Sequence, residues 1–280
     1  MDATPTDDLH ARLARRFGEA PRPPPDLPGR GVLEGMADHR SCRAFRPDPV
    51  AAALVETVVA AAFCAPSKSD LQQRDLVWVE DVAQRRRLEA LVPSVDWLPR
   101  APVLLMVLGN NRRQRRLHEM RGHPFANDQL DAFFNAATDA AVLLGWLVVA
   151  AEASGLGTCP ISQFRNDAEA VSEALGLPAH VFPYAGLAMG WPERVAPINP
   201  RLPLAATLHR DRFDDSALPE HVADADARRI AGKPFPSQRN VAAFGTAEPY
   251  GWSEDVTRQY ARPERAGFGA YVRRRGFCLD

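Results

Sequence analysis

A long apolar segment, residues 133–151, constrains the fold of this chain more than any other stretch. It reads FFNAATDAAVLLGWLVVAA and is apolar on nearly every face of a helix, so such a helix has to lie inside protein. A helix that crosses a membrane needs about 20 consecutive apolar residues. Asn135 and Asp139 interrupt this run. We therefore expect a helix buried at the centre of a bundle or in a subunit interface, and no membrane span.

Net charge and cysteine usage argue against several function classes. The 280 residues carry a formal net charge of −1, which gives no support to nucleic acid or an anionic membrane as a partner. The four cysteines form no CxxC pair, and no histidine stands at metal-ligand spacing beside one. We expect free thiols in a reducing cytoplasm and no metal site. The amino-terminal residues lack the apolar core of a signal peptide, which also favours a cytoplasmic protein.

The first 30 residues differ in composition from the rest of the chain. Residues 9–19 have the pattern of a short helix, and residues 21–28 read PRPPPDLP, which is typical of a stiff, polyproline-like linker. We predict an N-terminal extension with a Pro-rich linker over residues 1–30 and one domain over residues 31–280. The linker fits either a plain spacer or a ligand for a proline-recognition module.

A polar loop, HRSCRAF at residues 39–45, begins this predicted domain. It places two guanidiniums, an imidazole and a hydroxyl within five residues. Arginine offers a planar fork of donors and serine a hydroxyl, so such a loop suits a phosphate group. The prolines at positions 47 and 49 prevent a helix directly after it. Taken alone, the loop fits either a phosphate site or a solvated basic surface.

Hydrophobic patterns predict alternating helices and buried strands after this loop. The predicted helices cover residues 50–64, 81–91, 112–121, 133–151 and 166–175, with two more between residues 252 and 276 that are split at Pro263. The predicted buried strands cover residues 76–79, 101–108, 158–161 and 182–189. The basic helix at residues 112–121 fits either a solvated face or a surface that attracts a phosphate.

Three further motifs follow the polar loop in order. They are APSKSDLQ at residues 65–72, GLGTCPI at residues 155–161, and GWP at residues 190–192 followed by NPRLP at residues 199–203. With HRSCRAF they resemble the nitroreductase family of FMN-dependent oxidoreductases, and most of all its oxygen-insensitive, NADPH-preferring subgroup. The resemblance runs from residue 39 to the carboxyl end. It implies an α+β fold in which helices surround a mixed sheet, and a homodimer built on the long central helix at residues 133–151.

The resemblance also implies which residues bind FMN. His39, Arg40 and Ser41 would meet the phosphate and the ribityl chain, and Arg201 would be the distal phosphate arginine. Arg43 falls where the family places a cation beside N1 and O2 of the flavin, where it would stabilise the negative charge of the reduced ring.

A second group of implied FMN contacts lies in the APSKSDLQ motif. Ser67 would meet the ribityl or phosphate side. Asp70 stands where the family usually has Asn, and the carboxylate lacks the two N–H donors of the amide. Gln72 can act as donor or acceptor, so we expect it at the ring edge ahead of Asp70.

The third group follows the glycine motif. After Pro160 and Ile161 the family often has Glu-Gly or Gly-Gly, whose backbone N–H reaches flavin N5. This chain has Ser162 and Gln163 instead, which keep a backbone donor but narrow the substrate face. Asn199 replaces a frequent basic residue two positions before Arg201, so the phosphate grip loses one charge.

The function implied is the reduction of nitroaromatics, quinones or similar electron-poor small molecules by NAD(P)H, with ping-pong hydride transfer through flavin N5. The motifs form no Ser/His/Asp or Cys/His triad, so nothing indicates hydrolysis. Two alternatives stay open. One is another flavin enzyme on the same scaffold, such as a reductive dehalogenase, an enone reductase or a dehydrogenase. The other is a non-enzymatic flavin-binding module. Arg228, Arg229 and Arg239 would suit a 2′-phosphate, without deciding between NADH and NADPH.

Overall fold

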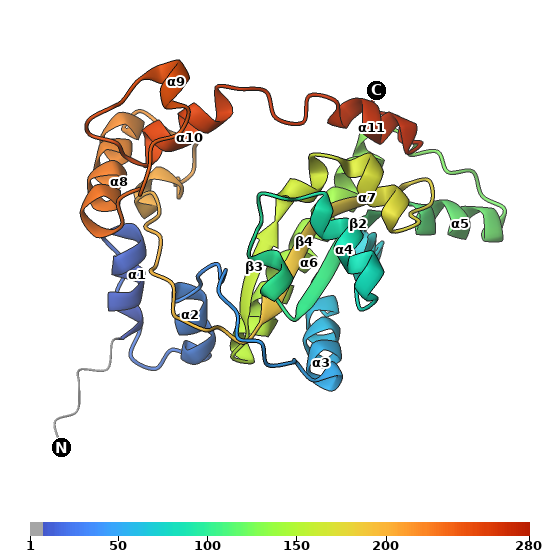
Figure 1. Cartoon of the computed structure of the whole chain (residues 1–280), viewed down its shortest axis with the longest axis horizontal. Coiled ribbons are helices and arrows are strands. Elements are labelled where there is room, and N and C mark those ends of the chain that lie inside the picture. Colours follow the sequence, from blue (N-terminus) through green and yellow to red (C-terminus); the bar gives the residue numbers. More distant parts are fainter. Residues whose placement is uncertain (1–7) are drawn as a thin grey trace. The chain divides into compact units, whose positions relative to one another are not determined.

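The computed structural model describes residues 8–280 (Figure 1). Contacts between Cα atoms divide the chain into two compact units. The first consists of Met1–Arg40 with Ala196–Glu264, and the second of Ser41–Val195 with Arg265–Asp280. The contacts divide the chain after Arg40, Val195 and Glu264. The predicted N-terminal extension over residues 1–30, followed by one domain, stays a prediction.

A four-stranded sheet forms the centre of the second unit. Its strands are β1 (Arg74–Trp78), β2 (Val103–Asn110), β3 (Gly157–Ile161) and β4 (Val181–Gly190), in the order β1-β2-β4-β3. All three strand pairs are antiparallel. The parallel contact among residues 8–280 is an isolated bridge from Ser41 to Thr158. The predicted α+β class is confirmed, and the mixed character of the sheet is limited to this bridge.

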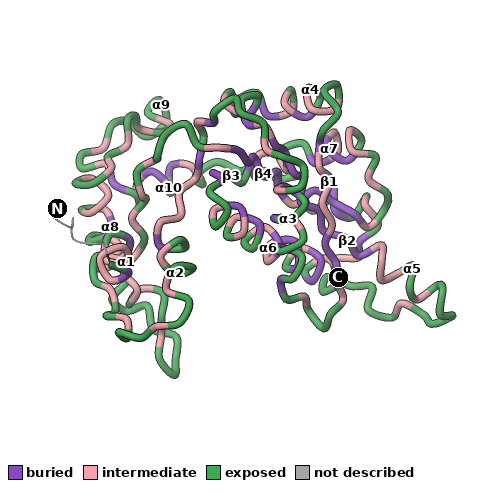
Figure 2. The backbone as a smooth tube through the Cα atoms, turned by 90° about the horizontal axis from the view of Figure 1, so that it is seen from below, coloured by how far each residue is buried: buried purple, intermediate pink, exposed green. Residues whose placement is uncertain are grey.

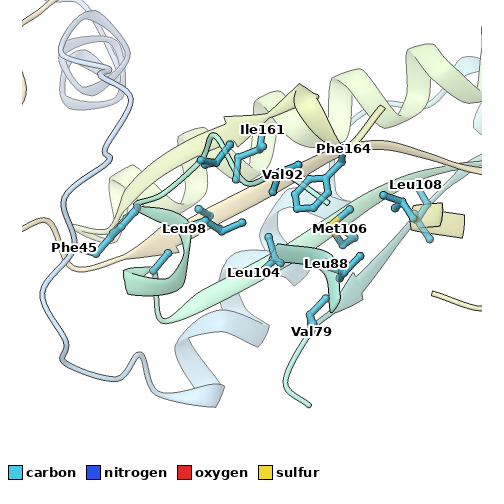
Figure 3. Close-up of a cluster of buried hydrophobic side chains, with 14 of the residues drawn as sticks. Phe45, Val79, Leu88, Val92, Leu98, Leu104, Met106, Leu108, Ile161 and Phe164 are labelled. Carbon is cyan, nitrogen blue, oxygen red and sulfur yellow. The ribbon is translucent and has the colours of Figure 1, made fainter. Parts of the chain in front are cut away.

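Helices cover both faces of the sheet. All eight residues of β2 are buried, and alternate side chains point to opposite faces. Leu104, Met106 and Leu108 pack in a core with α4 (Val82–Ala90) and α7 (Ala168–Ala174), which Figure 3 shows in part. The alternate residues, such as Leu105, pack in a second core with α3 (Ala52–Phe63) and α6 (Leu130–Ala153). This two-faced burial explains why the sequence of β2 is apolar without interruption.

The predicted central helix is α6, which has 24 residues. By length and composition it could cross a membrane, but one of its faces packs on the sheet and on α3. Its other face exposes large apolar side chains, with Phe134 62% exposed and Trp146 45% exposed. Figure 2 shows buried and exposed residues following one another along this helix. Within one chain, therefore, α6 is buried along one face only.

The remaining elements complete the two units. The second unit adds α5 (Arg112–Arg121), an exposed basic helix as predicted, and α11 (Phe268–Arg274), with the 3₁₀ turns η1 (Lys68–Asp70), η2 (Leu98–Arg100) and η3 (Ser162–Arg165). The first unit contains α1 (Leu9–Phe17), α2 (Arg30–Ala37), η4 (Leu204–Ala206), α8 (Leu218–Gly232), α9 (Val241–Phe244) and α10 (Trp252–Tyr260). The Asp8 carboxylate starts α1 by accepting from the Ala11 N–H at 2.9 Å, as an N-cap.

Candidate functional site

The segment after Arg40 lies along the edge of β3. Besides the Ser41–Thr158 bridge, the backbone N–H of Cys42 donates to the Thr158 carbonyl at 2.7 Å. Further along, Phe45 forms an antiparallel bridge with Pro192. These backbone contacts hold the chain on both sides of Arg43 in a fixed extended path.

Ser41 and Arg43 meet the thiol of Cys159 on β3. Burial raises the pKa of the Cys159 thiol above its ordinary value, and the charge of Arg43 and hydrogen bonds with Ser41 and Arg43 oppose this rise. The thiol is therefore protonated at neutral pH. It serves as a contact point for two of the predicted flavin-binding side chains, which the structure thus brings together with the segment from Pro160 to Gln163.

The end of β3 leads directly into η3. Pro160 is exposed and Ile161 is buried in the core. Ser162 is exposed at the start of the turn. The Gln163 side chain points toward Ser94, because its Oε1 accepts a hydrogen bond from the Ser94 hydroxyl at 2.8 Å. This contact sets the direction of the side chain that we expected to narrow a substrate face.

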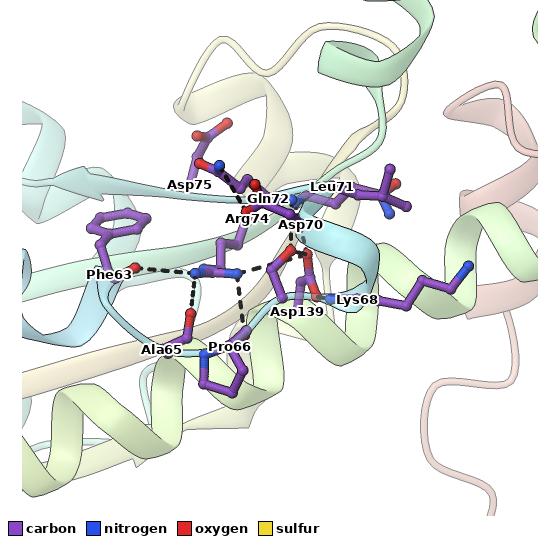
Figure 4. A network of polar contacts seen from close by, with 12 residues as sticks. Phe63, Ala65, Pro66, Lys68, Asp70, Leu71, Gln72, Arg74, Asp75 and Asp139 are labelled. Carbon is purple, nitrogen blue, oxygen red and sulfur yellow. Dashed lines mark hydrogen bonds and ion pairs between the residues drawn. The ribbon is translucent and has the colours of Figure 1, made fainter.

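A second part of the candidate site is the loop from Ala65 to Gln73, which is clamped by the buried carboxylate of Asp139 on α6 (Figure 4). Asp139 is 1% exposed. It accepts from the Ser67 hydroxyl at 2.9 Å, from the Lys68 N–H at 3.0 Å and from the Gln73 N–H at 2.8 Å. One carboxylate therefore holds both ends of the loop.

Arg74 completes this buried network. Its guanidinium is 3.8 Å from the Asp139 carboxylate and its side chain is 4% exposed. It donates to the carbonyls of Phe63 at 3.1 Å and Ala65 at 2.7 Å, at the end of α3. These bonds satisfy carbonyls that a helix end leaves without partners, so the network joins α3, the loop and α6.

The clamped loop has an unusual backbone. Ser69, Asp70 and Gln72 all have positive φ angles, at 49°, 56° and 52°, a region that costs energy for residues with a side chain. The Ser67 hydroxyl accepts from the Gln72 N–H at 2.6 Å. The Gln72 side-chain amide donates to the Asp70 carboxylate at 3.1 Å, and both side chains are exposed. Ser67 thus faces inward to Asp139, whereas Asp70 and Gln72 form an exposed pair.

His39, Arg40 and Arg201 belong to the first unit. Arg40 donates through Nε to the Asp38 carbonyl at 2.8 Å, and its Nη2 is 3.5 Å from the Asp38 carboxylate. Arg201 is exposed, and its backbone is held by a hydrogen bond from its N–H to the Arg16 carbonyl at 2.6 Å. Among residues 8–280, no carboxylate pairs with the side chain of Arg43 or Arg201.

The Asn199 side chain accepts hydrogen bonds from two cationic side chains. Its Oδ1 accepts from Arg229 at 3.1 Å and from Lys233 at 2.7 Å. The charge that the sequence lacks at position 199 is therefore supplied beside it from α8 and the residue that follows. The sequence offers no local signal for this, because the two partners lie 30 and 34 residues away.

A cavity of about 710 Å³ lies within the first unit beside these residues. Arg201, Arg229 and Arg239 line it together with the rings of Phe235 and Trp252. The Arg229 guanidinium lies 4.0 Å from the centre of the Phe235 ring, and burial lowers the pKa of Arg229 while the charge of Asp255 opposes this. Cations beside aromatic rings suit a ligand with a phosphate and a flat ring system.

Sequence reasoning missed the residues that hold the site. Asp139 and Arg74 carry the loop of Ser67, Asp70 and Gln72, and a signal existed for one of them, since an aspartate inside an apolar helix needs a buried partner. Among the described residues, no group of three or more histidines, cysteines or carboxylates is arranged to hold a metal ion.

Two models of one protein family match this chain. Residues 36–191 match the model of the nitroreductase family, and residues 199–280 match the C-terminal domain of that family. The chain belongs to the nitroreductase family. The family predicted from the four sequence motifs is thereby confirmed.

Relatives of this nitroreductase-family chain are named as FMN reductases and nitroreductases. It is 29% identical over 254 residues to an FMN reductase [NAD(P)H] of Bacillus subtilis, covering 89% of this chain and 98% of the relative. It is 27% identical over 249 residues to an oxygen-insensitive NADPH nitroreductase of Salmonella typhimurium, covering 88% and 98%. The solved structure of B. megaterium NfrA2 superposes with a TM-score of 0.80 at 29% identity, covering 89% and 98%. The FMN and NAD(P)H predicted here agree with these names.

Proposed function

We propose that this nitroreductase-family chain is an FMN-dependent oxidoreductase that uses NAD(P)H to reduce nitroaromatics, quinones or similar electron-poor small molecules. The observation that carries the proposal is Arg43, an exposed guanidinium without a carboxylate partner among residues 8–280, on a backbone path fixed against β3. A positive charge that is held in place and not neutralised is suited to stabilise negative charge that develops on a bound group.

The residues fit FMN in their chemistry. Exposed Arg201 and half-buried Arg40 are cations suited to the phosphate, with His39 and Ser41 as further hydrogen-bonding groups. We assign Arg43, Asp70, Gln72 and the turn from Pro160 to Gln163 to the ring. Asp70 and Gln72 already bond each other through the Gln72 amide and the Asp70 Oδ1, which leaves the Gln72 side-chain Oε1 and the Asp70 Oδ2 as acceptors for a ring N–H.

Bound FMN supplies the hydride relay between the donor and the acceptor. The chain supplies orientation and charge. Asp139 fixes the loop that carries Asp70 and Gln72 before any ligand arrives, so little ordering is left to occur upon binding. Ser67 acts through this loop, because its hydroxyl is bonded to Asp139 and to the Gln72 N–H. The charge of Arg43 would stabilise negative charge on a reduced flavin ring.

We assign the cavity of the first unit to the nucleotide part of the donor. Its aromatic rings suit an adenine, and Arg229 and Arg239 suit a phosphate. Arg239 pairs with the buried Asp255 at 2.8 Å, which fixes its direction and offsets part of its charge, so Arg229 is the main cation for a phosphate. A 2′-phosphate in this cavity would favour NADPH over NADH.

We also propose a homodimer in a cytoplasmic setting. The exposed apolar face of α6, with Phe134 and Trp146, supports a second copy of the chain as the occupant. Light scattering of the purified protein tests it. The variant F134E/W146E should shift a dimer to monomers, and a monomeric wild type would refute the proposal.

The activity is tested by oxidation of NAD(P)H with a panel of nitroaromatics and quinones. We expect R43Q to bind FMN. NADPH should reduce the flavin bound to R43Q roughly 10- to 100-fold more slowly than in the wild type, which is the effect of losing one charge-assisted hydrogen bond. The matched control R46Q alters an exposed arginine whose guanidinium is 3.2 Å from the Asp48 carboxylate and should behave as the wild type. Wild-type protein with bound FMN and no turnover would favour another flavin enzyme or a flavin-binding module.

A further inference from the structure

The N-terminal helix α1 inserts a buried arginine into the first unit. Helix α1 (Leu9–Phe17) precedes residue 36, where the family match begins. Arg16, in its last turn, is 5% exposed. A buried guanidinium is costly unless several acceptors surround it, so its partners indicate what the helix holds together.

The Arg16 guanidinium joins two distant segments. It donates through Nε to the Ala37 carbonyl at 2.8 Å and through Nη2 to the His39 carbonyl. Through Nη1 it donates to the Asn199 carbonyl at 3.0 Å, across 183 residues of sequence. The Arg16 carbonyl in turn accepts from the Arg201 N–H at 2.6 Å. One residue of α1 thus bonds the segment of His39 and Arg40 to the segment of Arg201.

The same helix also acts on the charge of Arg40. The carboxylate of Asp38 lies 3.5 Å from the Arg40 guanidinium. Arg12 forms a salt bridge with this carboxylate, and Arg15 lies 3.5 Å from it. Because the single carboxylate of Asp38 faces three arginines, it does not offset the charge of all of them, and the positive charges of α1 add to the attraction of Arg40 for a phosphate.

We propose that Arg16 is a positioning residue for the phosphate group of FMN. It sets the spacing between His39, Arg40 and Arg201, the three residues assigned to that phosphate. The inference rests on the proposed function, because it takes FMN as the ligand of these residues. It adds a working role for the N-terminal helix, which bonds the backbone of both phosphate-binding segments.

The test compares FMN with riboflavin, which has the same ring and ribityl chain but no phosphate. Wild-type protein, R16Q and the matched control R22Q, an exposed arginine of the same region, are stripped of flavin and titrated with each flavin by fluorescence quenching. R16Q should bind FMN at least about tenfold more weakly and riboflavin within about twofold of the wild type. R22Q should match the wild type for both flavins.

A merely structural role for Arg16 gives a different result, since R16Q would then lose affinity for both flavins equally. That outcome, or unchanged FMN binding by R16Q, overturns the inference. If R16Q does not fold, R16K carries the test, because lysine keeps the charge and loses the planar fork that reaches several carbonyls. R16K should weaken FMN relative to riboflavin, and equal effects on the two again overturn the inference. A wild type that binds no FMN refutes the proposed function itself.

Discussion

Replacing Asp139 by asparagine is the perturbation that most directly probes how the loop of the candidate site is held. Oδ2 of Asp139 accepts from Ser67 and Gln73, and Oδ1 accepts from Lys68. An asparagine has one oxygen and one NH₂ group in place of these two oxygens. In either orientation, at least one of the donors faces another donor. The guanidinium of Arg74, 4% exposed, also loses its negative partner.

The expected cost follows from the burial of this pair. Removing one partner of a buried ion pair costs about 3–5 kcal/mol, because the other charge is left uncompensated. We therefore expect D139N to lower the free energy of unfolding, measured by urea denaturation, by about 3 kcal/mol or more. FMN affinity should fall as well, because the left-handed backbone at Ser69, Asp70 and Gln72 is no longer held.

The matched control is D96N, since Asp96 is exposed and should change stability by less than about 0.5 kcal/mol. Adding R74M to D139N should recover part of the loss, because the uncompensated charge is then removed. A loss below about 1 kcal/mol in D139N, or an equal loss in D96N, would refute the reasoning that the carboxylate clamps the loop.

Two further predictions concern stability. Burial above all lowers the pKa of His180 below its ordinary 6.5, so the unfolded chain takes up the proton first. The contribution of neutral His180 to the free energy of unfolding is therefore fully present above the pKa of the unfolded chain, and it is lost as the pH drops below about 6.5. H180N should flatten this dependence in urea titrations, and an unchanged slope would contradict it. A Cβ at Gly157 would lie 2.7 Å from the Cys42 Cβ, so G157A should lose about 1–3 kcal/mol. The control G35A meets nothing within 4 Å and should lose no stability in the same assay.

Sequence patterns predicted the fold well where local chemistry decides it. The uninterrupted apolar run of β2 indicated a strand buried on both faces, and α6 was recognised from its length and composition. The single-sided burial of α6 was not predictable, because its exposed apolar residues look the same in sequence as those packed on the sheet. Which face a helix buries depends on the partners that the fold brings to it.

The motifs predicted the residues of the candidate site, but the sequence did not reveal the residues that hold them in place. The motif order placed Ser41, Arg43 and the segment after Pro160 in one family pattern, and Cys159 indeed meets Ser41 and Arg43. The Asp139 clamp was missed because its partners lie 66 to 72 residues away in sequence, and Asp139 was considered only as an interruption of an apolar run. Arg16 was missed for the same reason, since nothing near it in sequence indicates Asn199 as a partner.

The most direct test of the central claim is an anaerobic titration of purified, flavin-free protein with FMN, followed by NADPH, in a visible spectrophotometer. The account predicts a stoichiometric yellow complex that NADPH bleaches, with both signals weakened when Arg40 and Arg201 are replaced together by glutamine. A colourless protein that takes up no FMN, or a wild type and double variant that bind it equally well, would contradict the claim that these guanidiniums hold the coenzyme.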